Sequence, residues 1–579
     1  MVAIVANDAL ALQRLYHWET TAPDRVALTQ PVGGGAVVDY VWRDVLDQSR
    51  RVAAHLQSLG LHPGDRIAIL SKNTAHWLMS DFAIWLAGGV SVPLYPTLGS
   101  DTIRQILEHS ESRLLFVGKL DGWDAMKTGI PAGLPCISHP LSPEDAQGRH
   151  PQWDSIIAKT RPLAGKPVRS AESLATIIYT SGTTGTPKGV MHSFAAFPWM
   201  IRSVLQRFPD SQPSRRLSYL PLSHVAERLL IEHALLALGN HVFFTENLET
   251  FAEDMRRARP TRFFSVPRLW TKFQQGILAR IPADALDGQL ESQDARDTPA
   301  RLNLTAFGLH DCTLATGGAA PMPPELLRWY AKLGLNINQA YGMTECIASH
   351  ATVPGQETFG AVGLPYPGVQ CRLDSITSEV QIKSAAMMLG YYKEPELTDQ
   401  AFTADGWLRT GDKGVFDPDG NLRITGRVKD LFKTSKGKYV APAPIEQQVA
   451  THGAVEACCV TGAGLRQPIA LLMLNESACR NIAGPEGRVG LEVSLSEHLD
   501  RINSTLDPHE RLDCLVVMTE QWTVENDLVT PTLKVKRNRI EDAFSKYYEA
   551  WIGVGKRVVW HESRWPIGAT GNSRRPARP

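Results

Sequence analysis

Short apolar runs and helical patterns alternate along the first part of the chain. The run Arg66–Leu70 (RIAIL) predicts a buried strand, large apolar residues recur at helical spacing over residues 77–85, and Val90–Leu94 (VSVPL) predicts a second strand. A strand, a helix and a strand in this order are the repeating unit of a parallel sheet. We therefore expect an α/β fold.

Two further apolar runs end in segments that are rich in glycine and polar residues. Leu174–Tyr179 (LATIIY) leads into a Gly/Thr-rich stretch, and Asn336–Ala340 leads into YGMTE. Each run predicts a strand that is followed by a loop. Residues 120–170 and 281–305 are rich in Pro, Gly and Asp, and we interpret them as surface connections.

The pattern changes near residues 426–430. Before this point, Val415–Thr425 predicts a hairpin with Asp419-Gly420 in its turn, and after it the segment GRVKDLFKTSKGKYV is polar and rich in lysine. A capped helix at Ile445–Thr451 and a strand near Ala457–Gly462 are expected next.

These patterns predict three parts of the chain. Residues 1–426 form a large N-terminal α/β domain, residues 427–562 form a small α+β domain, and residues 563–579 form a disordered tail. The length of 579 residues agrees with several core-sized units, since ordinary domains have about 100–200 residues.

Composition and charge narrow the range of functions. Sixty basic and sixty acidic residues give a formal net charge of zero, which argues against a nucleic-acid-binding protein. The eight cysteines include no CxxC pair, so neither a zinc ribbon nor a redox dithiol is expected. The N-terminus lacks a basic region, and no apolar run approaches the ~18 residues of a membrane span. A cytoplasmic protein is expected.

The most informative stretch is residues 179–190, YTSGTTGTPKGV. It combines flexible glycines, hydroxyl donors and one lysine, which together suit a phosphate group: Thr180, Ser181, Gly182, Thr183, Thr184, Gly185, Lys188 and Gly189. It is not the P-loop GxxxxGK[ST], because Gly189 rather than Ser or Thr follows Lys188. A Gly/Thr-rich surface loop without a ligand is the ordinary alternative.

This stretch resembles the phosphate-binding loop of the adenylate-forming enzymes, which include acyl-CoA synthetases, luciferases and peptide-synthetase adenylation domains. Five later segments resemble motifs of the same family in the same order: ATGGAAPM at 315–322, YGMTE at 341–345, GWLRTGD at 406–412, GRVKDLFK at 426–433 and PTLKVKR at 531–537. LPLSHVAER at 220–228, KGKYVAPAPIE at 436–446 and TPTLKVKR at 530–537 resemble the long-chain fatty acyl-CoA synthetase branch.

The resemblance implies a fold and an activity. The fold is a large, multi-subdomain N-terminal α/β domain of the adenylate-forming type with a small mobile α+β C-terminal domain. The activity is ATP- and Mg²⁺-dependent conversion of a long-chain or medium-chain fatty acid to an acyl-adenylate, followed by transfer to coenzyme A. The alternatives are a ligase for another lipophilic or aryl acid, a ligase that loads a carrier-protein thiol, and a nucleotide-binding scaffold that no longer catalyses.

The resemblance also implies the roles of individual residues. The catalytic set is Lys534, Thr344, Glu345 and His224, and the Mg²⁺ ligands are Thr180 and Glu345. Nucleotide and coenzyme A contacts are assigned to the phosphate-loop residues other than Gly189 and to Gly317, Gly318, Ala319, Gln339, Ala340, Tyr341, Gly342, Asp412, Arg427, Lys429, Lys433 and Gly437.

Several of these assignments are specific. Lys534 would bridge the carboxylate and the α-phosphate, Tyr341 would stack on adenine, and Asp412 would accept from the ribose hydroxyls together with Arg427. Lys429 would be the hinge for domain rotation. Taken alone, these side chains have ordinary interpretations: a solvated lysine, a core aromatic, a turn residue and a Lys-rich loop.

Two further features are weaker evidence for a function. Arg256, Arg257, Arg259, Arg262 and Arg268 form a basic cluster that could meet anionic lipid headgroups at the inner face of a membrane, although a solvated face is the simpler interpretation. Apolar residues repeat at helical spacing over residues 266–277 and predict core or the wall of an acyl pocket. We expect Glu227 and Arg228 to form a local ion pair, and the oligomeric state stays open.

Overall fold

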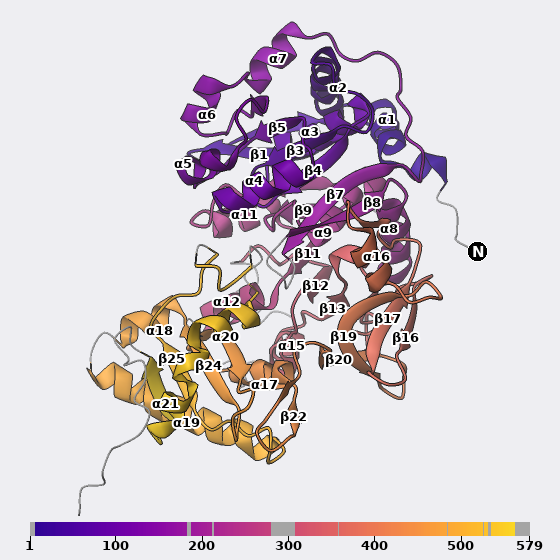
Figure 1. The fold of residues 1–579 in the computed structure, drawn as a ribbon. Coiled ribbons are helices and arrows are strands. Elements are labelled where there is room, and N and C mark those ends of the chain that lie inside the picture. Colours follow the sequence, from indigo (N-terminus) through magenta and orange to yellow (C-terminus); the bar gives the residue numbers. More distant parts are fainter. Residues whose placement is uncertain are drawn as a thin grey trace, which may run out of the picture. The chain divides into compact units, whose positions relative to one another are not determined.

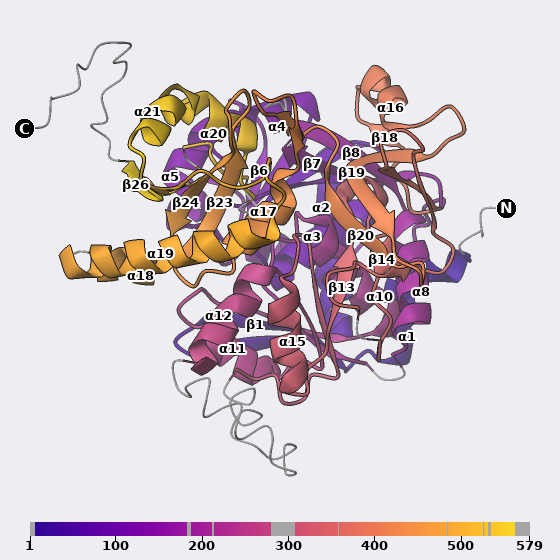
Figure 2. The same cartoon turned by 90° about the horizontal axis from the view of Figure 1, so that it is seen from below.

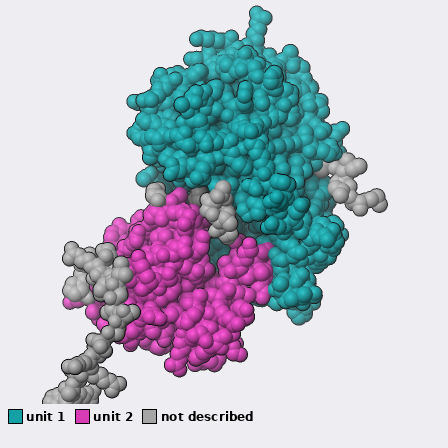
Figure 3. Space-filling model, in the orientation of Figure 1, with its two compact units in different colours: residues 1–410, 414–424 teal, residues 411–413, 425–579 magenta. Residues whose placement is uncertain are grey.

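The computed structural model describes residues 6–181, 187–210, 213–278, 307–356, 358–482, 485–524, 526–530 and 534–561. The chain forms two compact units, which Figure 3 shows in different colours. Unit 1 comprises residues 1–410 and 414–424, and unit 2 comprises residues 411–413 and 425–579.

Unit 1 contains a seven-stranded sheet (Figure 1). Its strands, in spatial order, are β18 (Gly390–Tyr391), β8 (Pro187–Ser193), β7 (Leu174–Ser181), β4 (Val90–Leu94), β3 (Arg66–Leu70), β5 (Leu114–Val117) and β6 (Cys136–Ser138). The strands from β7 to β6 are parallel to one another, whereas β8 runs antiparallel to β7, and β18 runs antiparallel to β8.

The predicted strand–helix–strand unit is confirmed. β3 and β4 have the predicted bounds and are parallel neighbours, and α3 (Ala75–Ala87) connects them. The Thr74 hydroxyl accepts from the Trp77 amide at 3.1 Å to cap the start of α3, and Gly88 ends the helix with a φ of 98°. Every residue of α3 is buried, including Asp81.

Alternation along β3 explains why both faces of this sheet are covered. Ile67 and Ile69 join a core with α2 (Trp42–Ser58) and α3, whereas Ala68 and Leu70 join a core with α4 (Ser100–His109). Side chains of consecutive strand residues point to opposite faces, so a continuous apolar run needs a helical layer on each side.

Three smaller sheets complete unit 1. The first is β2 (Ala36–Val41), β1 (Val26–Gly33), β10 (His241–Phe244) and β9 (Arg215–Ser218). The second is β11 (Arg262–Ser265), β12 (Leu314–Gly318), β13 (Ile337–Tyr341), β14 (His350–Ala351) and β15 (Leu364–Pro365). The third is β16 (Gln370–Leu373), β17 (Glu379–Lys383), β19 (Leu408–Phe416) and β20 (Leu422–Arg427), and its last two strands carry the chain into unit 2.

The remaining helices of unit 1 are mostly short. The α-helices are α1 (Ala11–Thr21), α5 (Trp123–Met126), α6 (Glu144–Arg149), α7 (Trp153–Lys159), α8 (Ala196–Arg207), α9 (Val225–Glu227), α10 (Ala234–Leu238), α11 (Phe251–Ala258), α12 (Pro267–Leu278), α15 (Pro324–Lys332) and α16 (Pro395–Ala401). The 3₁₀-helices are η1 (Asn7–Ala9), η2 (Lys127–Gly129) and η4 (Thr344–Cys346), and η3 (Arg228–His233) is a π-helix.

Unit 2 has a three-layer arrangement (Figures 1 and 2). Its sheet is β23 (Val455–Thr461), β24 (Ile469–Leu474), β25 (Leu515–Met518) and β26 (Val558–His561). One core packs α17 (Pro442–Val449), α18 (Glu476–Asn481) and α19 (Pro485–Thr505) on this sheet, and a second core packs α20 (Arg537–Phe544) and α21 (Tyr548–Gly553) with η5 (Ser545–Tyr547). A separate hairpin joins β21 (Phe432–Lys433) to β22 (Tyr439–Val440).

Some sequence predictions differ from the structure. Residues 120–170 are more than surface connections: they contain α5, α6, α7 and the edge strand β6, because apolar residues such as Trp123 and Trp153 are buried between their Pro and Gly neighbours. The helix expected at Ile445–Thr451 begins at Pro442, and no side chain caps it. Residues 281–305 and 563–579 lie outside the described residues.

Across the described ranges, none of the helices combines the length and the hydropathy required to cross a bilayer. The apolar residues expected over 266–277 lie on α12, where Trp270, Phe273 and Ile277 are buried in one core with β11 and β12 residues.

Candidate active site

The Gly/Thr-rich stretch joins two antiparallel strands. β7 ends at Ser181, β8 begins at Pro187, and Thr180 lies opposite Lys188 in their register. Both Thr180 and Lys188 are half-buried. The predicted phosphate-loop residues Gly182, Thr183, Thr184 and Gly185 lie outside the described residues, as does the side chain of Ser181.

Two parallel strands bring a second set of predicted residues together. β12 and β13 are neighbours, with Gly317 opposite Gln339 and Gly318 opposite Ala340. A Cβ on Gly318 would lie 2.4 Å from the Ala340 carbonyl oxygen, so only glycine fits there. The carboxyl ends of these strands meet at one edge, which is where parallel sheets bind ligands.

The turn after β13 contains Thr344 and Glu345 and ends in a strained residue, Ile347. Ile347 follows them with φ 65° and ψ −70°, and the Ala348 amide donates to the Cys346 carbonyl at 2.8 Å. This is a γ-turn with a β-branched residue at positive φ, a rare conformation that persists only where the surroundings enforce it. A Cβ on Gly342 would lie 2.6 Å from the Ala348 Cα, so the close approach of these two residues across the turn requires glycine at position 342.

Three hydrogen bonds fix this turn to neighbouring elements. His192 Nε2 on β8 donates to the Thr344 carbonyl at 2.7 Å, and the Met388 amide donates to the Glu345 carbonyl at 2.7 Å. The Tyr391 hydroxyl on β18 donates to Glu345 Oε1 at 2.8 Å. Burial lowers the pKa of His192 to about 4, so the ring is neutral at pH 7, and its proton resides on Nε2 because a carbonyl can only accept.

Sequence reasoning missed His192 and Tyr391. Both residues lie inside or beside apolar strand patterns, where an aromatic or a single histidine is most often core. The signal that could have found Tyr391 is its place in the GYYKEP segment, directly after a glycine with a φ of 142°.

The predicted metal ligands fit a hard cation in part. Glu345 supplies a carboxylate and Thr180 supplies oxygen, which are donors that suit Mg²⁺. In the described part of the chain, no cluster of three or more His, Cys, Asp or Glu residues could hold a metal ion. A cation here would therefore keep most of its ligands from water and from a bound phosphate, which is the usual manner of Mg²⁺.

His224 lies half-buried at the start of α9. Its Nδ1 accepts from the Ala226 amide at 3.2 Å, so part of its role is to cap that short helix.

Glu227 and Arg228 do not pair, so the expected local ion pair is wrong. Adjacent helical residues point in different directions. Glu227 Oε1 accepts from the Ser218 hydroxyl at 2.9 Å, the Tyr219 amide at 3.0 Å and Asn73 Nδ2 at 3.3 Å. Burial raises the pKa of Glu227 to about 8.

Arg228 is instead the centre of a fully buried ionic cluster. Its guanidinium binds Asp81 on α3, donates to Glu232 Oε2 at 2.8 Å and donates to the Thr176 hydroxyl at 2.6 Å. All three charged side chains have no exposed surface. Burial, and then the nearby Asp81 carboxylate, raise the pKa of Glu232 well above its usual range, although Arg228 lowers it.

In unit 2, the predicted ribose-binding pair lies together. Arg427 Nε and Asp412 Oδ1 are 3.1 Å apart, and the Asp412 side chain is 12% exposed whereas Arg427 is 55% exposed. Lys429 is exposed between β20 and β21. Lys433 and Gly437 belong to the β21–β22 hairpin, in which Gly437 has a φ of 76°.

Lys534 lies at the end of a hairpin-like loop in unit 2. Thr530 donates through its amide to the Lys534 carbonyl at 2.8 Å, and the Lys536 amide donates to the Leu528 carbonyl at 2.9 Å. Asp527 pairs with Lys536 and with Arg539 at the base of this loop. Lys534 is exposed, and residues 531–533 lie outside the described residues.

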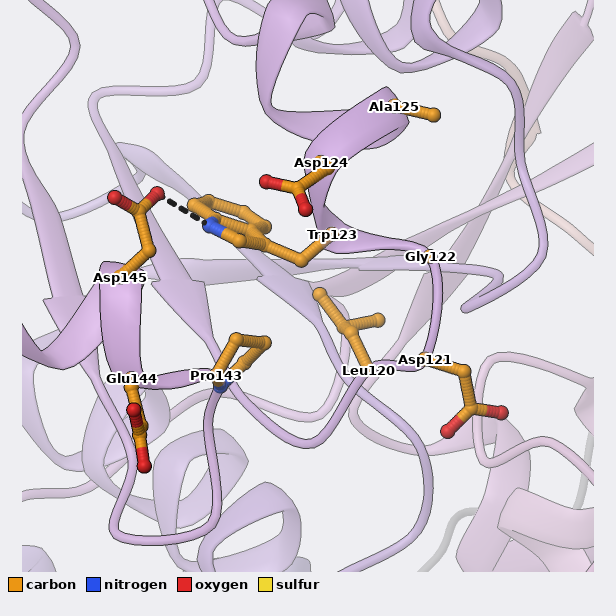
Figure 4. Close-up of a pocket in the computed structure, with 9 residues that line it drawn as sticks. All are labelled: Leu120, Asp121, Gly122, Trp123, Asp124, Ala125, Pro143, Glu144 and Asp145. Atoms are coloured by element: carbon orange, nitrogen blue, oxygen red, sulfur yellow. Dashed lines mark hydrogen bonds between the residues drawn. The ribbon is translucent and has the colours of Figure 1, made fainter.

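A surface pocket lies elsewhere in unit 1 (Figure 4). It has a volume of about 570 Å³ and is lined by residues 120–125 and 143–145, near α5 and α6. Figure 4 shows Trp123 Nε1 bonded to Asp145 Oδ2, at 3.0 Å. None of the predicted site residues lines this pocket, so it is separate from the candidate active site.

Two protein-family models match this chain. The family model described as AMP-binding enzyme matches residues 15–392, and that of the AMP-binding enzyme C-terminal domain matches residues 429–551. The long-chain-fatty-acid–CoA ligase FadD15 of Mycobacterium bovis is 28% identical over 566 residues, which cover 89% of this chain and 93% of the relative.

Solved structures confirm the predicted fold class. The adenylation domain of a carboxylate reductase from Mycobacterium chelonae has a TM-score of 0.77 at 23% identity, over 93% of this chain and 91% of that one. The corresponding domain from Segniliparus rugosus, solved with AMP and a co-purified carboxylic acid, has a TM-score of 0.76 at 23% identity, over 94% of both chains.

Proposed function

Because this chain belongs to the family of AMP-binding enzymes, we propose that it activates a long-chain or medium-chain fatty acid with ATP and transfers the acyl group to coenzyme A. The products are acyl-CoA, AMP and pyrophosphate. The long-chain ligase that matches 89% of this chain supports this choice of acid. The structural observation that carries the proposal is the turn with Thr344 and Glu345, which His192 and Tyr391 tie to the strand and sheet edge next to Lys188.

The first half-reaction joins two anions. The fatty acid carboxylate attacks the α-phosphorus of ATP, and the bond to pyrophosphate breaks. Lys188 and Lys534 supply the positive charge that this step needs, and a preorganised cation at a developing anion is worth about 10²–10³ in rate. Thr180 and Glu345 would hold Mg²⁺, which supplies further neutralisation of the phosphates when it is bound.

We assign the nucleotide contacts to residues at the ends of β12 and β13 and to the Asp412–Arg427 pair. Gly317, Gly318 and Ala319 leave room for the base beside Tyr341, and Gln339, Ala340 and Gly342 line the same strand end. Asp412 accepts from the ribose hydroxyls, and Arg427 orients that carboxylate from 3.1 Å. His224 borders the site of the acyl carboxylate.

The second half-reaction needs a different arrangement. The thiol of coenzyme A attacks the acyl-adenylate carbonyl, and AMP leaves. We assign residues 1–426 to an adenylation domain and residues 427–562 to a mobile domain that rotates about Lys429. In the second arrangement, Lys433 and Gly437 border the path of the pantetheine arm.

The basic cluster gives little support to a membrane contact. Arg257 pairs with Asp254, Arg259 pairs with Asp311, and Arg262 pairs with Asp210. These acids offset much of the charge that would attract anionic lipid. A solvated face of a cytoplasmic enzyme is the better proposal.

The deciding experiment is a panel of acids from C2 to C18 together with aryl acids. Pyrophosphate release reports the first half-reaction and acyl-CoA formation reports the second, and we expect both to be highest with long-chain or medium-chain acids. Highest turnover with aryl acids would show that the substrate is an aryl acid and not a fatty acid. Transfer to a carrier-protein thiol but not to coenzyme A would show that the acyl acceptor is a carrier protein. If no acid gives pyrophosphate, the protein is a non-catalytic scaffold.

A further inference from the structure

Tyr391 contacts two residues of the candidate active site at once. Its hydroxyl donates to Glu345 Oε1 at 2.8 Å, and the Lys188 ammonium lies 5.4 Å from the centre of its ring. Glu345 lies in the turn after β13, whereas Lys188 lies on β8. The tyrosine therefore joins two segments that are 157 positions apart in the sequence.

The backbone holds this tyrosine firmly in place. β18 pairs antiparallel with β8, which puts Tyr391 opposite Val190. The Tyr391 amide donates to the Thr398 hydroxyl on α16 at 2.9 Å. A Cβ on the preceding Gly390 would lie 2.9 Å from Thr398 Cγ2, so the close approach of β18 to α16 requires glycine.

The hydroxyl is the donor of this bond. A tyrosine hydroxyl carries a proton, whereas a carboxylate oxygen can only accept. A carboxylate has about four lone-pair positions, so accepting this bond leaves Glu345 able to contact a cation as well. The ring face attracts the Lys188 ammonium through a cation–π interaction.

We propose that Tyr391 is a positioning residue that aims the Glu345 carboxylate at the divalent cation accompanying ATP and holds Lys188 toward the phosphates. The inference rests on the proposed function of the same site. The hydroxyl orients the residue that meets the cation, and the ring orients the residue that meets the phosphates. Phenylalanine at this position removes the hydroxyl alone, and leucine removes the hydroxyl and the ring together.

The neighbouring Tyr392 provides a matched control. Its ring packs edge-on against His109 at 5.8 Å, and the Lys393 ammonium lies 5.3 Å from its centre, so it faces a different part of the sheet. A purely structural need for aromatic residues in this segment would affect both tyrosines alike.

The test measures the dissociation constant of α,β-methylene-ATP by calorimetry, once with Mg²⁺ and once with EDTA. This analogue cannot release pyrophosphate, so binding is measured without turnover. The proteins are the wild type, Tyr391→Phe, Tyr391→Leu and Tyr392→Phe, each with its melting temperature. The wild type should bind more tightly with Mg²⁺ than with EDTA.

Tyr391→Phe should bind the analogue about tenfold more weakly than the wild type when Mg²⁺ is present, which is the factor that corresponds to one hydrogen bond to a charged group. Its affinity for the analogue in EDTA should be unchanged. Tyr391→Leu should also weaken binding with EDTA by a few-fold, because the ring beneath Lys188 is gone. Tyr392→Phe should match the wild type. An unchanged Mg²⁺ effect in Tyr391→Phe, or equal losses in Tyr391→Phe and Tyr392→Phe, would overturn the inference.

The outcomes separate this inference from the proposed function. If the wild type neither binds the nucleotide nor releases pyrophosphate from ATP, the proposed function fails. If the wild type does both and Tyr391→Phe behaves identically at an unchanged melting temperature, the proposed function stands and the role of Tyr391 is wrong.

Discussion

At the residue scale, the buried cluster around Arg228 shows how one cation can serve two acids. The guanidinium lies over Trp77, Trp85 and Phe197 at 5.6–5.8 Å and is sealed from water. Burial, and then the nearby Asp81 carboxylate, raise the pKa of Glu232 well above its usual range. We therefore expect Asp81, which binds the same guanidinium, to supply most of its countercharge.

This assignment predicts unequal effects of two neutralising substitutions. Asp81→Asn should destabilise the fold by roughly 3–5 kcal/mol, because it leaves a buried guanidinium without its countercharge. Glu232→Gln should change stability by less than about 1 kcal/mol, because an amide resembles the protonated acid. Urea denaturation at pH 7 measures both, and a larger loss in Glu232→Gln would reverse the charge assignment.

The raised pKa of Glu227 predicts how the stability of the fold depends on pH. Burial raises the folded pKa of Glu227 to about 8, above the unfolded value near 4.5. The folded state then holds a proton that the unfolded state releases. This contribution to stability is complete below about pH 4.5 and is lost progressively as the pH rises from there through about 8.

The expected loss from Glu227 between pH 6 and pH 8 is about 2 kcal/mol. Glu227→Gln should keep the accepted bonds and flatten that part of the profile, since the amide does not titrate. Denaturation at both pH values in the wild type and the variant gives the difference. If the two proteins share the same pH dependence, Glu227 is ionised in the fold.

Lys534 carries the residue-scale prediction for catalysis. Lys534→Ala should slow pyrophosphate release by about 10²–10³, because a preorganised charge at the α-phosphate is lost. Acyl-CoA formation from supplied acyl-adenylate should retain most of its rate. Equal losses in both half-reactions would show that Lys534 has another role.

At the element scale, the loop that carries Lys534 depends on ion pairs at its base. Asp527 has a φ of 61° and pairs with Lys536 and Arg539. Asn tolerates that backbone conformation, so Asp527→Asn removes the charge while keeping the turn.

We expect Asp527→Asn to slow pyrophosphate release several-fold, because Lys534 samples more positions when the loop loosens. Each pair is partly exposed and is worth about 1 kcal/mol or less, so the melting temperature should fall only slightly. Asp419→Asn in the exposed β19–β20 turn is the control. A variant with unchanged pyrophosphate release would show that the loop is held by its backbone bonds alone.

At the scale of the whole molecule, the proposed mechanism requires one domain to rotate. Lys429 lies just after β20, where the chain enters unit 2, and proline there would fix φ near −65°. Such a substitution should separate the two half-reactions, because only one orientation would remain accessible.

For Lys429→Pro, we expect single-turnover pyrophosphate release to persist and acyl-CoA formation from supplied adenylate to fall. The proposal assigns most nucleotide contacts to one domain, whereas it requires the second orientation for thioesterification. Lys429→Ala controls for the loss of the side chain. A folded proline variant that runs both steps at wild-type rates would remove Lys429 as the hinge.

The fold could be predicted from the sequence wherever the pattern of a few consecutive residues specifies the element. The bounds of β3 and β4, the helix between them and the turn at Asp419-Gly420 were all predictable, since apolar period and turn chemistry act over a few residues. The α5–α7 region was mistaken for connections because its apolar residues are interrupted by Pro and Gly.

The amino-acid sequence by itself determined the family, the order of its motifs and the chemical types in the site, because these are written in contiguous residues. Only the tertiary structure decided which partners those residues have. Arg228 binds Asp81 rather than its neighbour Glu227, His192 reaches Thr344 and Tyr391 reaches Glu345. Such pairs join residues 46–152 positions apart, and their burial and distance arise when sheets and helices pack, which no local pattern encodes.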